Sequence, residues 1–228
     1  MHDGLGEPLS DGEYAEHAAL MLDLFGDEIV EKRKPDWTGN QRGVFSVIGA
    51  SNHSLTERAS RDFYATPTEA TEELLRLETF SRKILEPCCG MGHISKVLEA
   101  RGYEVESRDI EDRGFGKGGM DFLKCTDKNM PVSIITNPPY SLAKEFVEKS
   151  LEVVADGYKV AMFLKLTFLE GKNRRKMFER FPPKVVYVST SRLTCGKNGT
   201  EWLPSCICYA WFVWVKGFLG EPVIRWFN

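Results

Sequence analysis

The feature of this chain that most restricts its fold is a repeated alternation of short apolar segments and amphipathic helical segments that begins near residue 62. Strands are expected at residues 84–85, 103–110, 120–123, 132–136, 158–166, 184–189 and 206–215. Helices are expected between them, at residues 66–78, 94–100, 142–154 and 172–181. The helix at 66–78 would begin at Thr66 as N-cap, with Pro67 in its first turn and Glu69 closing a capping box. Such alternation indicates an α/β fold, a mostly parallel sheet with helices on both faces.

Length and composition indicate one main domain with an N-terminal addition. The chain has 228 residues, of which 42% are apolar and 28% charged. Apolar residues at helical spacing predict a helix at residues 10–25, so we assign residues 1–60 to a helical and loop extension and residues 61–228 to the main domain. No apolar run reaches the roughly 18 residues of a membrane span, and the first residues lack a secretory pattern. We expect a cytoplasmic protein without membrane contact.

Cysteine spacing and charge restrict the partners. The six cysteines form no CxxC pair and no zinc-type spacing with histidine, so we expect no metal. Residues 1–31 contain nine acids and no Lys or Arg, whereas residues 171–200 hold eight bases against one acid. The basic stretch favours an acidic partner such as nucleic acid. With one lysine at the end of the strand at 158–166, the candidate contacts are Lys165, Arg174, Arg175, Lys176, Arg192 and Lys197.

A glycine turn follows the strand at 84–85, in the sequence EPCCGMGH. Gly90 and Gly92 would allow a ligand to approach the backbone at a helix N-terminus. Ser95 stands where a dinucleotide fingerprint has its third glycine, and Glu86 precedes the turn. A carboxylate there would repel a pyrophosphate, so the turn suits a cation or an amine.

Two further acids end the next expected strands, where sheets of this kind bind their ligands. Asp109 is placed to bind ribose hydroxyls. Asp121 and Phe122 suit the amino group and the ring face of an adenine. Together with the acidic glycine turn, they describe a pocket for an adenosine with a positively charged amino-acid tail, which fits S-adenosylmethionine.

The sequence NPPY, residues 137–140, follows the strand at 132–136. The two prolines continue neither a strand nor a helix, but they fix the backbone. The side-chain oxygen of Asn137 and the carbonyl of Pro138 could then accept hydrogen bonds from a planar amino group and stabilise the charge that develops when it is methylated. Tyr140 could stack on an extruded base. We assign the catalytic role to Asn137, Pro138, Pro139 and Tyr140, without a general base.

NPPY together with EPCCGMG resembles the class I adenine-N6 DNA methyltransferases. DFYATP, residues 62–67, is similar to their segment that closes over the methionine part of the cofactor, and GASNHS, residues 49–54, is similar to a segment of small phage and mobile-element enzymes. The resemblance covers about residues 44–228. It implies a Rossmann-like class I methyltransferase fold, with a seven-stranded sheet that has one antiparallel strand. The implied cofactor-binding residues are Tyr64, Thr66, Pro67, Glu86, Cys88, Gly90, Gly92, Asp109, Ile110, Asp121, Phe122 and Asn137.

The same resemblance implies methyl transfer to adenine N6 in double-stranded DNA, with the target base flipped out. The chain has little room for a target-recognition insert, so short or relaxed sequence specificity is expected. RNA adenine and a protein glutamine remain alternative substrates. Two other hypotheses are a nucleic-acid-binding module without catalysis and a dehydrogenase. The recognised sequence, the oligomeric state and any partner restriction enzyme stay open.

Overall fold

The computed structural model describes residues 63–197, 199 and 207–228, all within the second of the two units into which the chain divides, Arg42–Asn228. The helix expected at residues 10–25, GASNHS and the domain boundary after residue 60 lie outside the described residues. No helix in the described part is long and apolar enough to cross a lipid bilayer.

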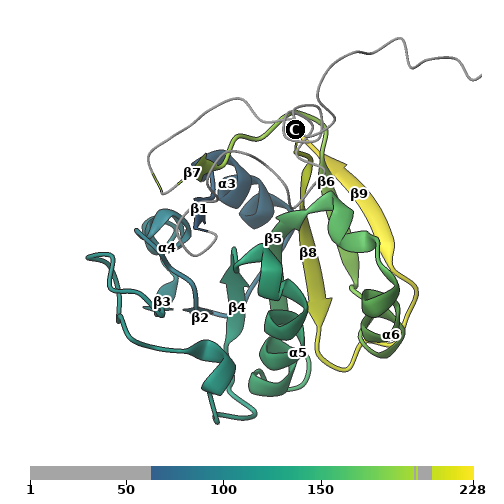
Figure 1. Ribbon diagram of the computed structural model, residues 1–228, viewed down its shortest axis with the longest axis horizontal. Helices are drawn as coiled ribbons and strands as arrows, with labels where there is room; N and C mark the ends of the chain where they lie inside the picture. Colours follow the sequence, from purple (N-terminus) through teal and green to yellow (C-terminus); the bar gives the residue numbers. More distant parts are fainter. Residues whose placement is uncertain (1–62, 198, 200–206) are drawn as a thin grey trace, which may run out of the picture. The chain divides into compact units, whose positions relative to one another are not determined.

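Seven strands form one sheet in the order β3-β2-β4-β5-β8-β6-β9 (Figure 1). Their bounds are β2 Lys83–Glu86, β3 Glu104–Ser107, β4 Ser133–Thr136, β5 Lys159–Lys165, β6 Val185–Ser189, β8 Tyr209–Val215 and β9 Val223–Phe227. All neighbouring pairs are parallel except those of β8, which runs antiparallel to β5 and β6. The predicted fold class, a seven-stranded sheet with one antiparallel strand, is confirmed.

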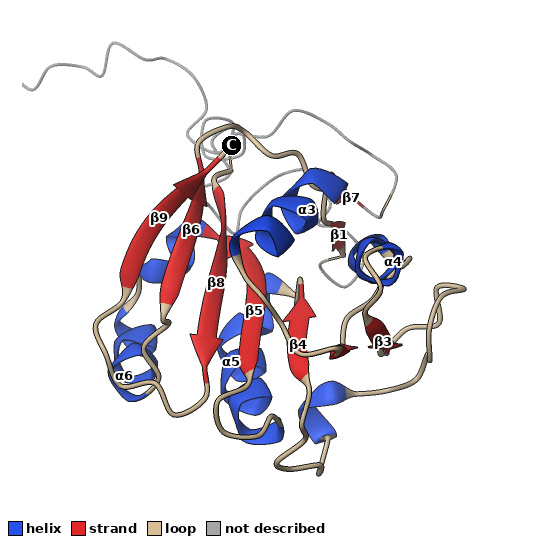
Figure 2. Ribbon diagram, turned by 180° about the vertical axis from the view of Figure 1, so that it is seen from behind, coloured by secondary structure: helices blue, strands red, loops and turns tan. Residues whose placement is uncertain are grey.

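Helices cover both faces of this sheet. Their bounds are α3 Thr68–Leu77, α4 His93–Ala100, α5 Ala143–Val153 and α6 Lys172–Arg180, with short 3-10 helices η3 Phe122–Lys124, η4 Tyr140–Leu142 and η5 Leu166–Leu169. Seen from opposite sides, α5 and α6 lie on one face and α3 and α4 on the other (Figures 1 and 2). The alternation of strands and helices along the sequence therefore predicted the layers correctly.

Side-chain alternation along the central strands builds two separate cores. In β5, Val160, Met162 and Leu164 pack in the cluster that contains α5 and α6 residues. Ala161 and Phe163 point the other way and pack with residues of α3 and α4. All five are essentially unexposed, as expected for a strand covered on both faces.

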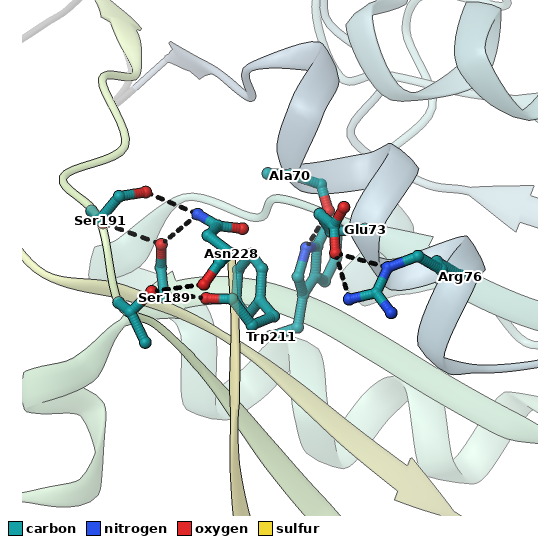
Figure 3. A network of polar contacts seen from close by, with 9 residues as sticks. Ala70, Glu73, Arg76, Ser189, Ser191, Trp211 and Asn228 are labelled. Atoms are coloured by element: carbon teal, nitrogen blue, oxygen red, sulfur yellow. Dashed lines mark hydrogen bonds and ion pairs between the residues drawn. The ribbon is translucent and has the colours of Figure 1, made fainter.

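Polar contacts fix α3 and the C-terminus to the sheet (Figure 3). The indole N–H of Trp211 in β8 donates to the Ala70 carbonyl of α3 at 2.7 Å. The Asn228 amide donates to Ser189 Oγ at 2.9 Å and to Ser191 Oγ at 2.6 Å, which ties the end of β9 to the end of β6.

The strand expected at residues 120–123 is wrong. Asp121 caps the 3-10 helix η3 there, since its Oδ1 accepts the Leu123 N–H at 3.1 Å. Four glycines between residues 114 and 119 give the preceding segment no side-chain pattern that would hold a strand. The seventh strand is instead β9, which lies beyond the last strand that the sequence suggested and forms the far edge of the sheet.

The start of α3 also differs from expectation. Pro67, not Thr66, is the N-cap residue, and no side chain caps the helix. The Thr66 hydroxyl is used elsewhere, because its oxygen accepts a hydrogen bond from Asn137. The predicted capping box is therefore wrong, and the competing interaction belongs to the candidate active site.

Candidate active site

A cavity of about 790 Å³, its open mouth included, lies at the carboxyl ends of β2, β3 and β4. This is the edge at which sheets of this type bind ligands. Nine of the twelve predicted cofactor-binding residues line it, namely Tyr64, Thr66, Glu86, Cys88, Asp109, Ile110, Asp121, Phe122 and Asn137. Pro67, Gly90 and Gly92 do not line it directly. Of the four residues assigned to catalysis, Asn137 and Pro139 line the cavity.

A small second sheet closes one side of the cavity. β1, Tyr64–Ala65, pairs antiparallel with β7, Gly196–Lys197, so that Tyr64 lies opposite Lys197. β1 comes from DFYATP, and β7 comes from the connection between β6 and β8. Two segments that the sequence suggested for different partners, cofactor and nucleic acid, are thus hydrogen-bonded to each other.

Asn137 is held through its amide nitrogen. Nδ2 donates to the Tyr64 carbonyl at 2.7 Å and to Thr66 Oγ1 at 3.0 Å. Because a backbone carbonyl can only accept, these contacts fix which end of the amide is nitrogen. The opposite end, Oδ1, takes part in neither contact, and Asn137 lines the cavity.

The glycine turn is shaped by aromatic rings and by Asp109. Gly90 and Gly92 have positive φ angles of 54° and 80°, and a Cβ at either position would collide with the ring of Phe63 or Phe115. Asp109 is buried; its Oδ2 accepts the Gly90 N–H and its Oδ1 the Glu111 N–H, both at 2.8 Å. The glycines therefore admit aromatic side chains, and Asp109 fixes the turn to the end of β3.

Glu86 is fully buried beneath the start of α4. The Ser95 hydroxyl donates to Glu86 Oε2, and Ser95 and Ser107 lie within hydrogen-bond distance, 2.6 Å between their oxygens. Burial raises the pKa of Glu86 to about 8, while the Ser95 hydrogen bond opposes this shift. Ser95, which stands where a dinucleotide fingerprint has its third glycine, is thus the hydrogen-bond partner of the Glu86 carboxyl.

Aromatic residues surround the NPPY segment. The Tyr140 ring lies between Tyr64, with centroids 5.8 Å apart and stacked, and Tyr209, at 6.0 Å. The Lys165 ammonium lies 4.9 Å from the Tyr140 ring centre. Burial raises the pKa of the Tyr140 hydroxyl well above its usual value, so this group stays protonated. Tyr140 is thus already stacked within the protein, which restricts the face that it can offer to a base.

Asp121 and Phe122 are the pair that was predicted to bind the adenine. Phe122 is buried and stacks on Phe146 of α5 at 5.5 Å. Asp121 pairs with Lys124 at 3.1 Å. Both residues line the cavity, with the exposed side chain of Ile110 at its rim.

The basic residues differ in how they are used. The Arg174 guanidinium binds the carbonyls of Glu170 and Thr167 and lies over Phe168, so it stabilises the link from η5 to α6. Arg175 pairs with Glu179 at 2.7 Å, whereas Lys176 is exposed. Arg192 Nη1 lies 2.6 Å from the Cys208 sulfur. The backbone of Lys197 belongs to β7, and its side chain lies outside what the structure describes.

Several cavity residues were not assigned from the sequence. Phe63, Cys89, Arg113, Met120, Leu142 and Phe146 belong to this set. Phe146 could have been found from helical spacing, because it lies on the buried face of α5. Arg113 follows Asp109 by four residues in an irregular segment, and no periodic pattern marks it. Among the described residues no group of three or more His, Cys, Asp or Glu side chains could hold a metal ion.

Comparison with solved structures agrees with the fold. A protein from Pyrococcus horikoshii, provisionally assigned as an RNA methyltransferase, matches with a TM-score of 0.54 at 15% identity, over 79% of this chain and 100% of that chain. A predicted O-methyltransferase from Agrobacterium tumefaciens gives 0.50 at 11% identity, over 70% and 85% of the two chains. A Lactococcus lactis protein, provisionally assigned as a hemolysin, gives 0.51 at 12% identity, over 70% and 91%.

These likenesses identify the architecture as the class I methyltransferase fold. No protein-family model and no curated protein matches the sequence. At such low identities the fold alone is shared, and one fold can host many activities. The activity has to be argued from the site.

Proposed function

We propose that this protein transfers a methyl group from S-adenosylmethionine to the N6 amino group of adenine in DNA. The observation that carries the proposal is the orientation of the Asn137 amide, whose nitrogen is bound by Tyr64 and Thr66 so that its oxygen is available as an acceptor. Asn137 lines a cavity that Glu86 and Asp109 also line.

The chemistry of an aromatic amine explains why such an acceptor matters. The lone pair of the adenine amino nitrogen is delocalised into the ring, so the group is a weak nucleophile. Hydrogen bonds from its N–H groups to Asn137 Oδ1 and to the Pro138 carbonyl would favour a pyramidal nitrogen and stabilise the positive charge that develops on it. Tyr64 and Thr66 keep the Asn137 amide oriented before the substrate arrives, and the fixed φ of Pro138 and Pro139 restricts the backbone that carries the carbonyl.

The residues of the cavity fit the proposed methyl donor. S-adenosylmethionine, when bound, supplies an electrophilic methyl group on a positively charged sulfur. Asp109 Oδ2 and Oδ1 each keep an acceptor site beside the backbone N–H groups that they bind, and could accept ribose hydroxyls. Glu86 would gain charge beside an ammonium group, because an adjacent cation lowers the pKa of a carboxyl. Phe122 offers an apolar wall for an adenine ring.

DNA is favoured among the acceptors by charge and by the NPPY and DFYATP resemblance. Lys165 beside Tyr140 and the exposed lysine side of α6 could contact phosphates. We also propose short or relaxed sequence specificity, as the sequence suggested. We place the protein in the cytoplasm, with residues 61–228 as the methyltransferase domain.

The test is to incubate the protein with S-adenosylmethionine labelled in its methyl group and with unmethylated DNA, RNA or a protein extract, then to identify the labelled residue. N6-methyladenine in DNA supports the proposal. Label in RNA adenine or in glutamine would move the same chemistry to another substrate. Cofactor binding without any transfer would support a non-catalytic module. Asn137→Ala should abolish transfer, and Asn129→Ala, an exposed residue away from the cavity, should not.

A further inference from the structure

Arg113 is the cationic side chain of the cavity to which nothing above assigns a role. Among the described residues that line the cavity it is the one Lys or Arg, beside the acids Glu86, Asp109 and Asp121. His93 also lines the cavity, but burial lowers its pKa, so it is neutral near pH 7. A ligand that carries both an ammonium and a carboxylate would find acceptors for the first in the acids and one candidate partner for the second.

The position of Arg113 is fixed by an aromatic ring and not by a carboxylate. Its guanidinium carbon lies 4.4 Å from the centre of the Phe63 ring, and the same ring fills the space over Gly90. In the described part of the chain no acid forms an ion pair with Arg113, although three acids line the same cavity. Stacking on an aromatic face orients a guanidinium while leaving its N–H donors directed outward.

One of those donors is buried without a partner. Arg113 Nε has no hydrogen-bond acceptor among the described residues. Buried donors in folded proteins are nearly always satisfied, and the exceptions point to a role for the group. A planar guanidinium with an unsatisfied edge suits bidentate binding of a carboxylate.

We propose that Arg113 binds the α-carboxylate of the amino-acid part of the methyl donor. This inference rests on the proposed function. Arg113 would be the residue that distinguishes S-adenosylmethionine from a ligand whose amino-acid part lacks the carboxylate. Glu86 would hold the ammonium, and Arg113, supported by Phe63, would hold the carboxylate on the side of the glycine turn. The pocket would then be selective for a zwitterionic tail.

The experiment measures dissociation constants by isothermal titration calorimetry for two ligands, S-adenosylmethionine and its decarboxylated form. Arg113→Met keeps an apolar side chain on Phe63 but removes the guanidinium. It should weaken S-adenosylmethionine binding about tenfold to a hundredfold, while binding of the decarboxylated ligand changes less than about twofold. Arg113→Lys should recover part of the loss, because an ammonium restores charge but not the planar fork. Lys117→Met removes an exposed cation from the same segment and should change neither constant.

The outcomes separate this inference from the proposed function. Equal loss for both ligands, or no loss for either, would overturn the role of Arg113. NADP⁺ bound more tightly than S-adenosylmethionine by the wild-type protein, and weakened by Arg113→Met, would mean that Arg113 binds a phosphate, which also overturns it. Selective loss for the complete ligand, in a protein that transfers no methyl group to any acceptor, would support Arg113 and refute the proposed function. A wild-type protein that binds neither ligand would refute both.

Discussion

Two regions at the carboxyl edge of the sheet are built in opposite ways. On the side of β2, β3 and β4, the polar groups are buried or half-buried and are hydrogen-bonded to the backbone: Asp109 accepts the Gly90 N–H, and Asn137 donates to the Tyr64 carbonyl. On the side of η5 and α6, the basic groups are exposed or used in local contacts, such as the pair between Arg175 and Glu179. The first arrangement can recognise a ligand by shape and hydrogen bonding, and the second offers charge.

This difference explains why the two regions should respond differently to mutation. A group preorganised in a cavity contributes through geometry, so its removal has a large effect that salt hardly changes. An exposed cation contributes through a screened field, so its removal has a small effect that disappears at high salt. The largest effect is expected for the most deeply buried group, Glu86.

Glu86 should make stability depend on pH. Its pKa is about 8 in the folded protein, against 4.5 as the ordinary value. Between these values the unfolded chain loses a proton that the folded protein keeps, so the free energy of unfolding decreases as pH rises from about 4.5 to about 8 and is level above. Glu86→Gln should remove most of this slope, on the order of 5 kcal/mol across the window. Urea unfolding at pH 5, 7 and 9 measures it.

The control for this slope is Glu221→Gln, an exposed acid that precedes β9 and does not contribute to the pKa of Glu86. Its curve should follow the wild type. If the free energy of unfolding of Glu86→Gln depended on pH as in the wild type, Glu86 would have to be ionised in the folded protein at pH 7. Glu86 would then no longer be an example of a buried, protonated group in the cavity.

Asn137→Ala should reduce methyl transfer by about a hundredfold to a thousandfold, the range seen when one preorganised polar group is removed from a site that stabilises developing charge. The cofactor dissociation constant should change little, because the acceptor acts on the amine. Single-turnover rates and calorimetry measure the two quantities. Full activity in this variant would refute the assigned role of the NPPY segment.

Asp109→Ala should weaken cofactor binding about tenfold to a hundredfold, since it removes an acceptor for ribose and releases the N–H groups of Gly90 and Glu111. Asp112→Ala is the matched control, because this exposed acid three residues away binds only the Gly114 N–H among the described groups, at 3.0 Å. Calorimetry with S-adenosylmethionine measures both variants. Equal affinities for the two would show that the carboxylate of Asp109 is not used by the ligand.

The sequence predicted the regular part of the molecule well because its periodicity reflects burial. The continuous apolar run of β5 and the spacing of α5 are consequences of the two cores, and both were located to within a residue or two. The acids at the expected strand ends also led to the cavity, since Glu86, Asp109 and Asp121 all line it, although Asp121 caps η3 and ends no strand.

The errors arose where long-range contacts decide local structure. Thr66 has the composition of a helix cap, but its hydroxyl is bound to Asn137, 71 residues away in the chain. Residues 120–123 have the composition of a strand, but Phe122 stacks on Phe146 of the distant helix α5, and Asp121 caps η3. Arg113 was missed for the same reason, because only the packing of Phe63 reveals its place. Such contacts have no signature in local spacing.

The smallest expected effect concerns the basic region. Lys172 and Lys176 lie one turn apart on α6 and are both exposed. If this face contacts DNA, replacing both by alanine should lower affinity several-fold at low salt and reduce the slope of log affinity against log salt by about 1.8, or 0.9 per lost phosphate contact. Fluorescence anisotropy with a labelled duplex at 50 to 200 mM salt measures both.

Lys83→Ala is the control for the loss of positive charge. This exposed lysine lies at the amino end of β2, away from the carboxyl ends of the parallel strands. It should leave the salt slope unchanged. An equal effect of Lys83→Ala would mean that DNA responds to net charge and not to α6. A loss with Lys172 and Lys176 that persists at high salt would instead mean that α6 recognises its target by shape, and the contrast between the two regions would fail.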